Sequence, residues 1–335
     1  MAKSSKPKPS KRLVSLDAYR GLVMLAMASS GLAFARVWEQ SREQVIEQAN
    51  GQPWQEAWPQ LWDVLAYQFS HVPWTGCSFW DLIQPSFMFM VGVSMPFSYS
   101  KREALGQSKL RMLSHAIVRS LMLVLLAIFL SSNWNGQTNF IFTNVLAQIG
   151  LGYTVVYLLW RWNLVVQLVA VAGILGGYWF YFYQYTIPEA EFSKVKTVVT
   201  EQMELDADEE FNQFPRLPSH WNKHTNAAAG FDREYLSRFP REAEEWEGRT
   251  YWVNKGGYQT LNFIPSIVTM LFGVMAGRLI RGDRSDGNKL KWLFLSGGIC
   301  FLTAMAVDTT IWPAKVPHCN WSFCPIVKRI WSPSW

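Results

Sequence analysis

The chain has little of several features that mark common soluble proteins. Its four cysteines are too few for a disulfide framework, and Cys319 and Cys324 could either pair in an oxidising compartment or stay as two free thiols. The sequence holds no glycine-rich phosphate-binding motif and no nucleophile-elbow pattern. His220 and His224 are four residues apart without a further ligand at suitable spacing, so we expect no metal.

Charged residues are also scarce, at 17% of the chain. The net charge of +6 raises the question of nucleic-acid binding. However, the basic residues sit in short blocks beside apolar runs, as the topology signals of membrane proteins do. We therefore expect membrane lipids, and no nucleic acid, among the partners.

Apolar and aromatic residues are abundant: half of the chain is hydrophobic, with 18 Trp and 21 Phe. Runs approaching the length of a bilayer-spanning helix alternate with polar stretches. The expected fold is an all-α polytopic membrane protein with about seven transmembrane helices and a large extracytoplasmic loop. The expected spans are 13–35, 79–99, 117–132, 141–160, 162–183, 260–280 and 292–311.

The basic residues predict the orientation of these spans. They gather in the N-terminal tail, in the connection after the second span, at Arg161 and in the connection after the sixth span. The longer segment 184–259 holds more acidic than basic residues. The positive-inside rule therefore places the N-terminus in the cytoplasm. A cleavable signal peptide is the competing interpretation, although Asp17 and Arg20 interrupt its apolar stretch.

This orientation divides the chain into five parts. They are a basic cytoplasmic tail at 1–12, a five-helix membrane region at 13–183 that includes an extracytoplasmic loop at 36–78, an extracytoplasmic loop at 184–259, two further helices at 260–311, and an extracytoplasmic segment at 312–335.

Polar residues inside the expected spans need a reason, because the bilayer disfavours them. Asp17 and Arg20 share a helix face, either as a structural ion pair or as the lining of a cavity for a charged ligand. Asn144 and Gln148 form one polar stripe, which is typical of interhelical hydrogen bonding.

His71 and Asp81 lie on the far side, just before and at the start of the second span. An interfacial His is often inert, but it can also act as a general base or a nucleophile. Asp81 could cap the helix or orient the nearby imidazole.

Several segments resemble the heparan-alpha-glucosaminide N-acetyltransferase family and its bacterial relatives. The most specific is His71-Val72-Pro73-Trp74-Thr75-Gly76 followed by Asp81-Leu82-Ile83-Gln84-Pro85. Three others support it: Ser15-Leu16-Asp17-Ala18-Tyr19-Arg20-Gly21, Asn144-Val145-Leu146-Ala147-Gln148-Ile149-Gly150, and 257–266.

The resemblance implies acetyl transfer from cytoplasmic acetyl-CoA to the amine of a glucosamine-type sugar on the far side of the membrane. It implies that His71 is the active-site histidine, as a base or as a carrier of the acetyl group, with Asp81 fixing its tautomer. Trp74 and Asn262 are expected to bind the sugar. The residues expected to bind acetyl-CoA are Asp17, Arg20, Asn144 and Gln148.

The chain departs from the family pattern in two places. Gln148 stands where relatives tend to have Arg, so Arg20 or the basic connection 101–119 would have to meet the CoA phosphates. The chain also stops where relatives continue, so a truncated, inactive member is one alternative. A solute transporter is another. The expected location is a bacterial inner membrane, and homo-oligomers remain open.

Overall fold

The computed structural model describes residues 14–28, 64–71, 74, 77–133, 136–202, 204–206, 211, 219–239 and 258–307. Within these ranges the secondary structure is helical, without a strand. The expected basic tail, most of the loop expected at 36–78, and the C-terminal segment with Cys319 and Cys324 lie outside the described residues. The chain forms two compact units, Met1–Phe69 and Ser70–Trp335.

The first unit contains α1, Val14–Ala28, and a short helical stretch at 64–68. α1 has 15 residues, fewer than the expected first span. Asp17 and Arg20 lie on it three residues apart, and Arg20 is exposed. The helix therefore gives the two residues a shared face, whereas their role in acetyl-CoA binding stays a prediction.

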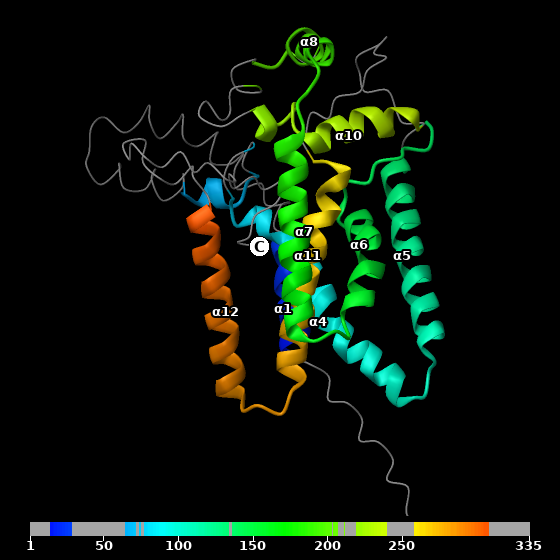
Figure 1. Cartoon of the computed structure of the whole chain (residues 1–335), viewed down its shortest axis with the longest axis vertical. Coiled ribbons are helices and arrows are strands. Elements are labelled where there is room, and N and C mark those ends of the chain that lie inside the picture. The colour runs from blue at the N-terminus through cyan, green and yellow to red at the C-terminus, as the bar shows by residue number, and fades with distance from the viewer. Residues whose placement is uncertain are drawn as a thin grey trace, which may run out of the picture. The chain divides into compact units, whose positions relative to one another are not determined.

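The second unit is a helical bundle (Figure 1). Its long helices are α4 (Ile83–Ala104), α5 (Lys109–Ser132), α6 (Val145–Leu159), α7 (Leu164–Gln184), α11 (Phe263–Arg281) and α12 (Asp286–Val307). Two short 3-10 helices, η2 (Trp80–Leu82) and η6 (Thr260–Asn262), lead into α4 and α11.

Three stretches of the described residues are long and apolar enough to cross a membrane: Lys109–Ser132, Leu164–Gln184 and Thr260–Arg281. α6 is apolar but has only 15 residues. These helices indicate an integral membrane protein. A helix also lies at each of the other expected spans, but the count of seven stays a prediction, as does the orientation.

Side-chain caps explain where some helices begin. Ser108 accepts a hydrogen bond from the Arg111 backbone N–H, so α5 begins at Lys109 rather than at 117. Asn144 caps α6 through the Ala147 N–H, so α6 begins four residues later than the span expected from 141. In both cases hydropathy located the helix, and the cap set its first residue.

α11 is the central helix of the second unit and packs against α4, α6 and α7. In its membrane-length window 61% of the residues are buried, against 17% for α5 and for α7. Gly92 of α4 and Gly273 of α11 bring the two backbones together, because a Cβ on either glycine would clash with a backbone carbonyl of the facing helix. Lipid provides little hydrophobic force between helices, so close packing of this kind stabilises their association.

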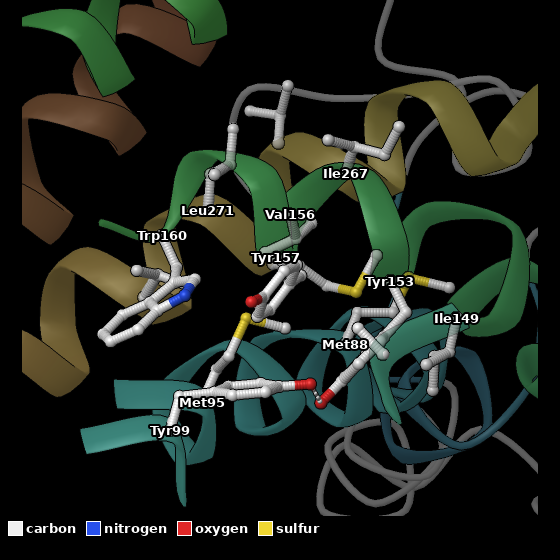
Figure 2. Close-up of a cluster of buried hydrophobic side chains, with 14 of the residues drawn as sticks. Met88, Met95, Tyr99, Ile149, Tyr153, Val156, Tyr157, Trp160, Ile267 and Leu271 are labelled. Carbon is white, nitrogen blue, oxygen red and sulfur yellow. Dashed lines mark hydrogen bonds between the residues drawn. The ribbon is translucent and has the colours of Figure 1, made fainter. Parts of the chain in front are cut away.

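The core of this bundle joins α4, α6 and α11 (Figure 2). Tyr99 is fully buried, and its hydroxyl lies 3.2 Å from the Tyr153 hydroxyl. The Tyr99 ring also packs against Tyr157 and, stacked, against Trp160. Met88, Met95 and Leu271 are among the apolar side chains around them. The hydrogen bond satisfies polar atoms that would otherwise be costly to bury.

The segment between α7 and α11 contains several short helices. They are α8 (Glu189–Thr197), the π-helix η3 (Val198–Gln202), η4 (Ser219–Trp221), α10 (Ala227–Tyr235) and η5 (Leu236–Arg238). Figure 1 shows α8 and α10 at the end of the bundle where α7 ends and α11 begins. The sequence predicted this segment as a loop, and its described parts form a helical cover over that end.

The join between α7 and this cover depends on a small residue. Tyr185 follows α7, and its hydroxyl lies so close to Gly230 of α10 that any Cβ there would clash. Burial raises the pKa of the Tyr185 hydroxyl above its ordinary value of 10.0, so the group stays neutral at physiological pH.

Candidate functional site

His71 and Asp81 are in direct contact at the covered end of the bundle. His71 Nδ1 lies 2.6 Å from Asp81 Oδ1. Asp81 belongs to η2, and its side chain is 1% exposed, whereas the His71 side chain is 48% exposed. The pair therefore joins a fixed carboxylate in the protein interior to an imidazole that solvent can reach.

The second carboxylate oxygen of Asp81 holds the start of the helix. Oδ2 accepts a hydrogen bond from the Ser78 backbone N–H at 3.0 Å, and the Asp81 N–H donates to the Ser78 carbonyl at 3.1 Å. The Ser78 hydroxyl lies 2.8 Å from Oδ2 and 2.6 Å from the Ser70 carbonyl, and its single proton donates to one of them. Asp81 thus contacts both His71 and the backbone of Ser78, which lies just before Phe79, the N-cap of η2.

The contact sets the tautomer of His71. An ionised carboxylate can only accept, so Nδ1 carries the proton and Nε2 has a free lone pair. Within the described residues no hydrogen bond reaches His71 Nε2. A half-exposed imidazole with a buried carboxylate behind it and an available Nε2 can take a proton or attack a carbonyl carbon.

Two aromatic rings stand near the imidazole. The Trp80 ring centroid is 6.5 Å away at an interplanar angle of 72°, and the Tyr258 centroid is 6.3 Å away at 75°. Trp80 belongs to η2, and Tyr258 lies two residues before η6. Sequence reasoning missed both residues, because only the fold brings position 258 next to position 71.

Trp74 does not have the accessibility that sugar stacking requires. It is 2% exposed, and its indole N–H donates to the Trp221 carbonyl at 3.1 Å. Phe182 and Trp221, which stack on each other, belong to the same buried cluster. This burial argues against direct packing of Trp74 on a sugar face, which stays a prediction, and the hydrogen bond fastens Trp74 itself to the helical cover.

Asn262, the other expected sugar ligand, is 6% exposed at the N-terminus of α11. Its backbone carbonyl accepts a hydrogen bond from the Ser266 hydroxyl at 2.7 Å. The structure places it four residues after Tyr258 and thus at the same end as His71. Its buried position limits direct contact with a ligand.

Asn144 and Gln148 are engaged by the protein itself. Asn144 caps α6 and also donates to the Ala127 carbonyl and the Ser131 hydroxyl of α5, at 3.3 and 3.1 Å. Gln148 is fully buried, and its amide nitrogen lies 2.8 Å from the Phe142 carbonyl and 3.2 Å from the Thr260 carbonyl. These contacts favour interhelical hydrogen bonding over the acetyl-CoA contacts expected for both residues.

A buried polar network anchors the cover to α11. Asp232 of α10 is 1% exposed, and its Oδ2 accepts a hydrogen bond from the Thr260 N–H at 3.0 Å, at the start of η6. Its neighbour Arg233 pairs with Glu191 of α8 at 2.7 Å and donates to the His224 carbonyl at 2.6 Å. Because Tyr258 lies two residues before Thr260, this network also positions one of the rings beside His71. No local pattern in the sequence indicates the network.

Basic residues occupy the opposite end of the bundle. Arg102 approaches His115 Nε2 at 2.9 Å. Arg161 pairs with Glu103 at 3.0 Å. These residues could meet an anionic ligand. Groups of three or more metal-ligating side chains do not occur in the part of the chain that the structure describes.

Comparison with known proteins identifies the segment that carries this site. Residues 60–198 match the family model described as heparan-alpha-glucosaminide N-acetyltransferase, catalytic. The match contains His71, Asp81 and the helices from α4 to α7. No curated protein matches the chain. Over this segment the chain is similar to the heparan-alpha-glucosaminide N-acetyltransferase family, which supports the resemblance seen in the sequence and suggests a transmembrane acetyltransferase family.

Proposed function

We propose that this protein transfers an acetyl group from acetyl-CoA, supplied from the cytoplasm, to the amine of a glucosamine-type sugar on the other side of the membrane. The observation that carries the proposal is the His71–Asp81 contact within the family-matched segment. The contact orients the ring and leaves Nε2 available, as the reaction requires.

The chemistry follows from that available nitrogen. In direct transfer, the uncharged amine attacks the thioester carbonyl, a C–N bond forms and the C–S bond breaks. His71 Nε2 takes the proton that the amine loses, and the CoA thiolate receives a proton as it leaves. The buried Asp81 carboxylate stabilises the imidazolium that forms between these steps.

A two-step route uses the same atoms. Nε2 attacks the thioester first, and the acetyl group becomes bonded to the imidazole while CoA leaves. The sugar amine then attacks this acyl-imidazole, which regenerates free His71. Incubation with labelled acetyl-CoA and no sugar distinguishes the routes, because only the two-step route places the label on His71.

The basic end of the bundle supports entry of the donor from the side opposite His71. Lys101 and Arg111 are exposed there, as contacts with CoA phosphates require. α4 has 22 residues and is therefore about 33 Å long, and it joins this end to η2 and Asp81. The proposal thus requires the acetyl-carrying part of acetyl-CoA to enter the bundle from the basic end and to reach toward His71.

The test is acetyl-CoA-dependent acetylation of glucosamine by the purified chain in detergent. We expect activity in the wild type and a fall of roughly 10²–10⁴-fold in His71→Ala, the usual contribution of a positioned general base. His220→Ala is the matched control, because His220 lies at the same end but contacts the Tyr185 carbonyl instead of a carboxylate. An unchanged rate in His71→Ala would overturn the proposal.

A further inference from the structure

The acceptor needs a binding surface next to His71 Nε2. Trp74, the aromatic residue first expected to bind the sugar, is too buried to provide this surface. Trp74 is 2% exposed and fastened to Trp221, so neither face of its indole can take a ligand. Trp80 and Tyr258 differ in both respects. Both are partly exposed, and both rings lie within 6.5 Å of the His71 ring, measured between centroids.

The orientation of the two rings suits a cyclic ligand. Their planes are inclined by 72° and 75° to the imidazole plane. They therefore stand as walls beside His71 and do not cover it as a stacked ring would. A pyranose has flat, apolar C–H faces that pack on aromatic rings, while its hydroxyl and amino groups point outward from the ring edge.

The charge of the acceptor fits as well. An amino sugar arrives partly as an ammonium ion, which the negative face of an aromatic ring attracts. Loss of this proton to water leaves the neutral amine held by the packing of the sugar ring, and His71 Nε2 stays available to take the second proton during acetyl transfer. The aromatic walls thereby bind both protonation states of the acceptor.

Both rings are held by the structure around them. Trp80 directly precedes Asp81, whose carboxylate is fixed by Ser78. Tyr258 precedes η6, whose Thr260 N–H is bonded to the buried Asp232. The two walls come from segments that are distant in the sequence and meet only at His71. Such preorganisation lowers the entropy cost of binding.

We propose that Trp80 and Tyr258 form the acceptor platform and select a pyranose amino sugar over an open-chain amine. This inference rests on the proposed function and adds to it the residues that hold the acceptor. Neither residue takes part in proton or acetyl transfer, so their effect falls on acceptor binding and not on the chemical step.

The test compares glucosamine with its open-chain reduction product, an amino polyol with the same amino group and no ring. In the wild type we expect a lower KM for glucosamine. In Trp80→Leu and in Tyr258→Leu we expect that KM to rise about three- to tenfold, the range expected from the loss of one aromatic contact. The kcat, the KM for acetyl-CoA and the KM for the open-chain amine should stay unchanged.

Two variants control for damage to the fold. Tyr258→Phe keeps the ring and should behave as the wild type. Tyr183→Leu removes another exposed aromatic ring, which contacts Trp179 and His220, and should leave the KM for glucosamine unchanged. An unchanged KM for glucosamine in both platform variants, or equal changes for both acceptors, would overturn the inference.

Binding measured without donor separates this inference from the proposed function. Saturation-transfer NMR of glucosamine with the full chain should show binding that survives His71→Ala and weakens about three- to tenfold in each platform variant. If the wild type binds glucosamine in this way but transfers no acetyl group, the proposed function fails and the platform stands. If acetyl transfer occurs but glucosamine binds equally well to the wild type and to both platform variants, the platform inference is wrong and the proposed function stands.

Discussion

The two ends of the second unit differ in how deeply their polar groups are buried and in what those groups bond to. At the His71 end, Asp81, Gln148 and Asp232 are nearly inaccessible to solvent, and each is bonded to backbone groups. At the opposite end, Arg161 and Glu103 pair through side chains that are 47% and 32% exposed. The first arrangement fixes atoms in place, whereas the second leaves charges free to rearrange in water.

This difference agrees with what the proposed function requires of each end. A buried polar group without its partner is costly, so a network of such groups has essentially one arrangement. Proton transfer needs that fixed geometry, because the imidazole must keep its tautomer and direction. Surface charges, by comparison, are screened and gain little from any single pair, but they can follow an anionic ligand or signal topology.

The largest effect should come from Asp81→Asn. The amide has a single acceptor oxygen, and when that oxygen keeps the Ser78 N–H, its NH2 group faces Nδ1 and donates to it, so the imidazole proton moves to Nε2. We expect kcat to fall by roughly 10²–10⁴-fold with little change in the KM for either substrate. Steady-state kinetics measures this, and thermal unfolding in detergent checks that the cap at Ser78 survives. A kcat within about threefold of the wild type would show that the buried carboxylate is not needed.

A smaller effect is expected for Asp232→Ala, which leaves the Thr260 N–H buried without its acceptor. We expect a loss of about 1–3 kcal/mol in stability. Chemical unfolding of the purified chain in detergent measures it. Asp232→Asn keeps an acceptor oxygen at the same position and should lose less. Equal stability of the alanine variant and the wild type would mean that the cover does not depend on this contact.

The smallest effect should follow Arg161→Ala at the basic end. The pair joins an exposed Arg161 to a half-buried Glu103, and pairs near the surface contribute about 0–1 kcal/mol. Stability and the acetylation rate with saturating acetyl-CoA should therefore remain near the wild-type values. A loss as large as that of Asp232→Ala would remove the contrast between the two ends.

Sequence patterns were sufficient for part of this structure. Apolar runs located the helices because membrane-length hydrophobicity is a property of consecutive residues. The motif from His71 to Asp81 predicted a contact between its two candidate site residues, which lie only ten positions apart in the sequence.

The rest depended on contacts between distant segments. Nothing local marks Tyr258 as a neighbour of His71, or Asp232 as the cap of Thr260. Trp74 and Trp80 are both Trp residues near the same turn, and only packing decides that Trp74 is buried while Trp80 remains partly exposed. The relation of Asp17 and Arg20 to this site stays a prediction, because α1 lies in the other unit.

The central claim is that His71 and Asp81 act as one unit, and a double-mutant cycle on acetylation tests it most directly. We would measure kcat for wild type, His71→Ala, Asp81→Asn and the double variant with glucosamine and acetyl-CoA. If Asp81 acts only through His71, the double variant is no slower than His71→Ala, because the carboxylate has no imidazole left to orient. If the two losses multiply, the residues act independently, and the claim that they form one unit is contradicted.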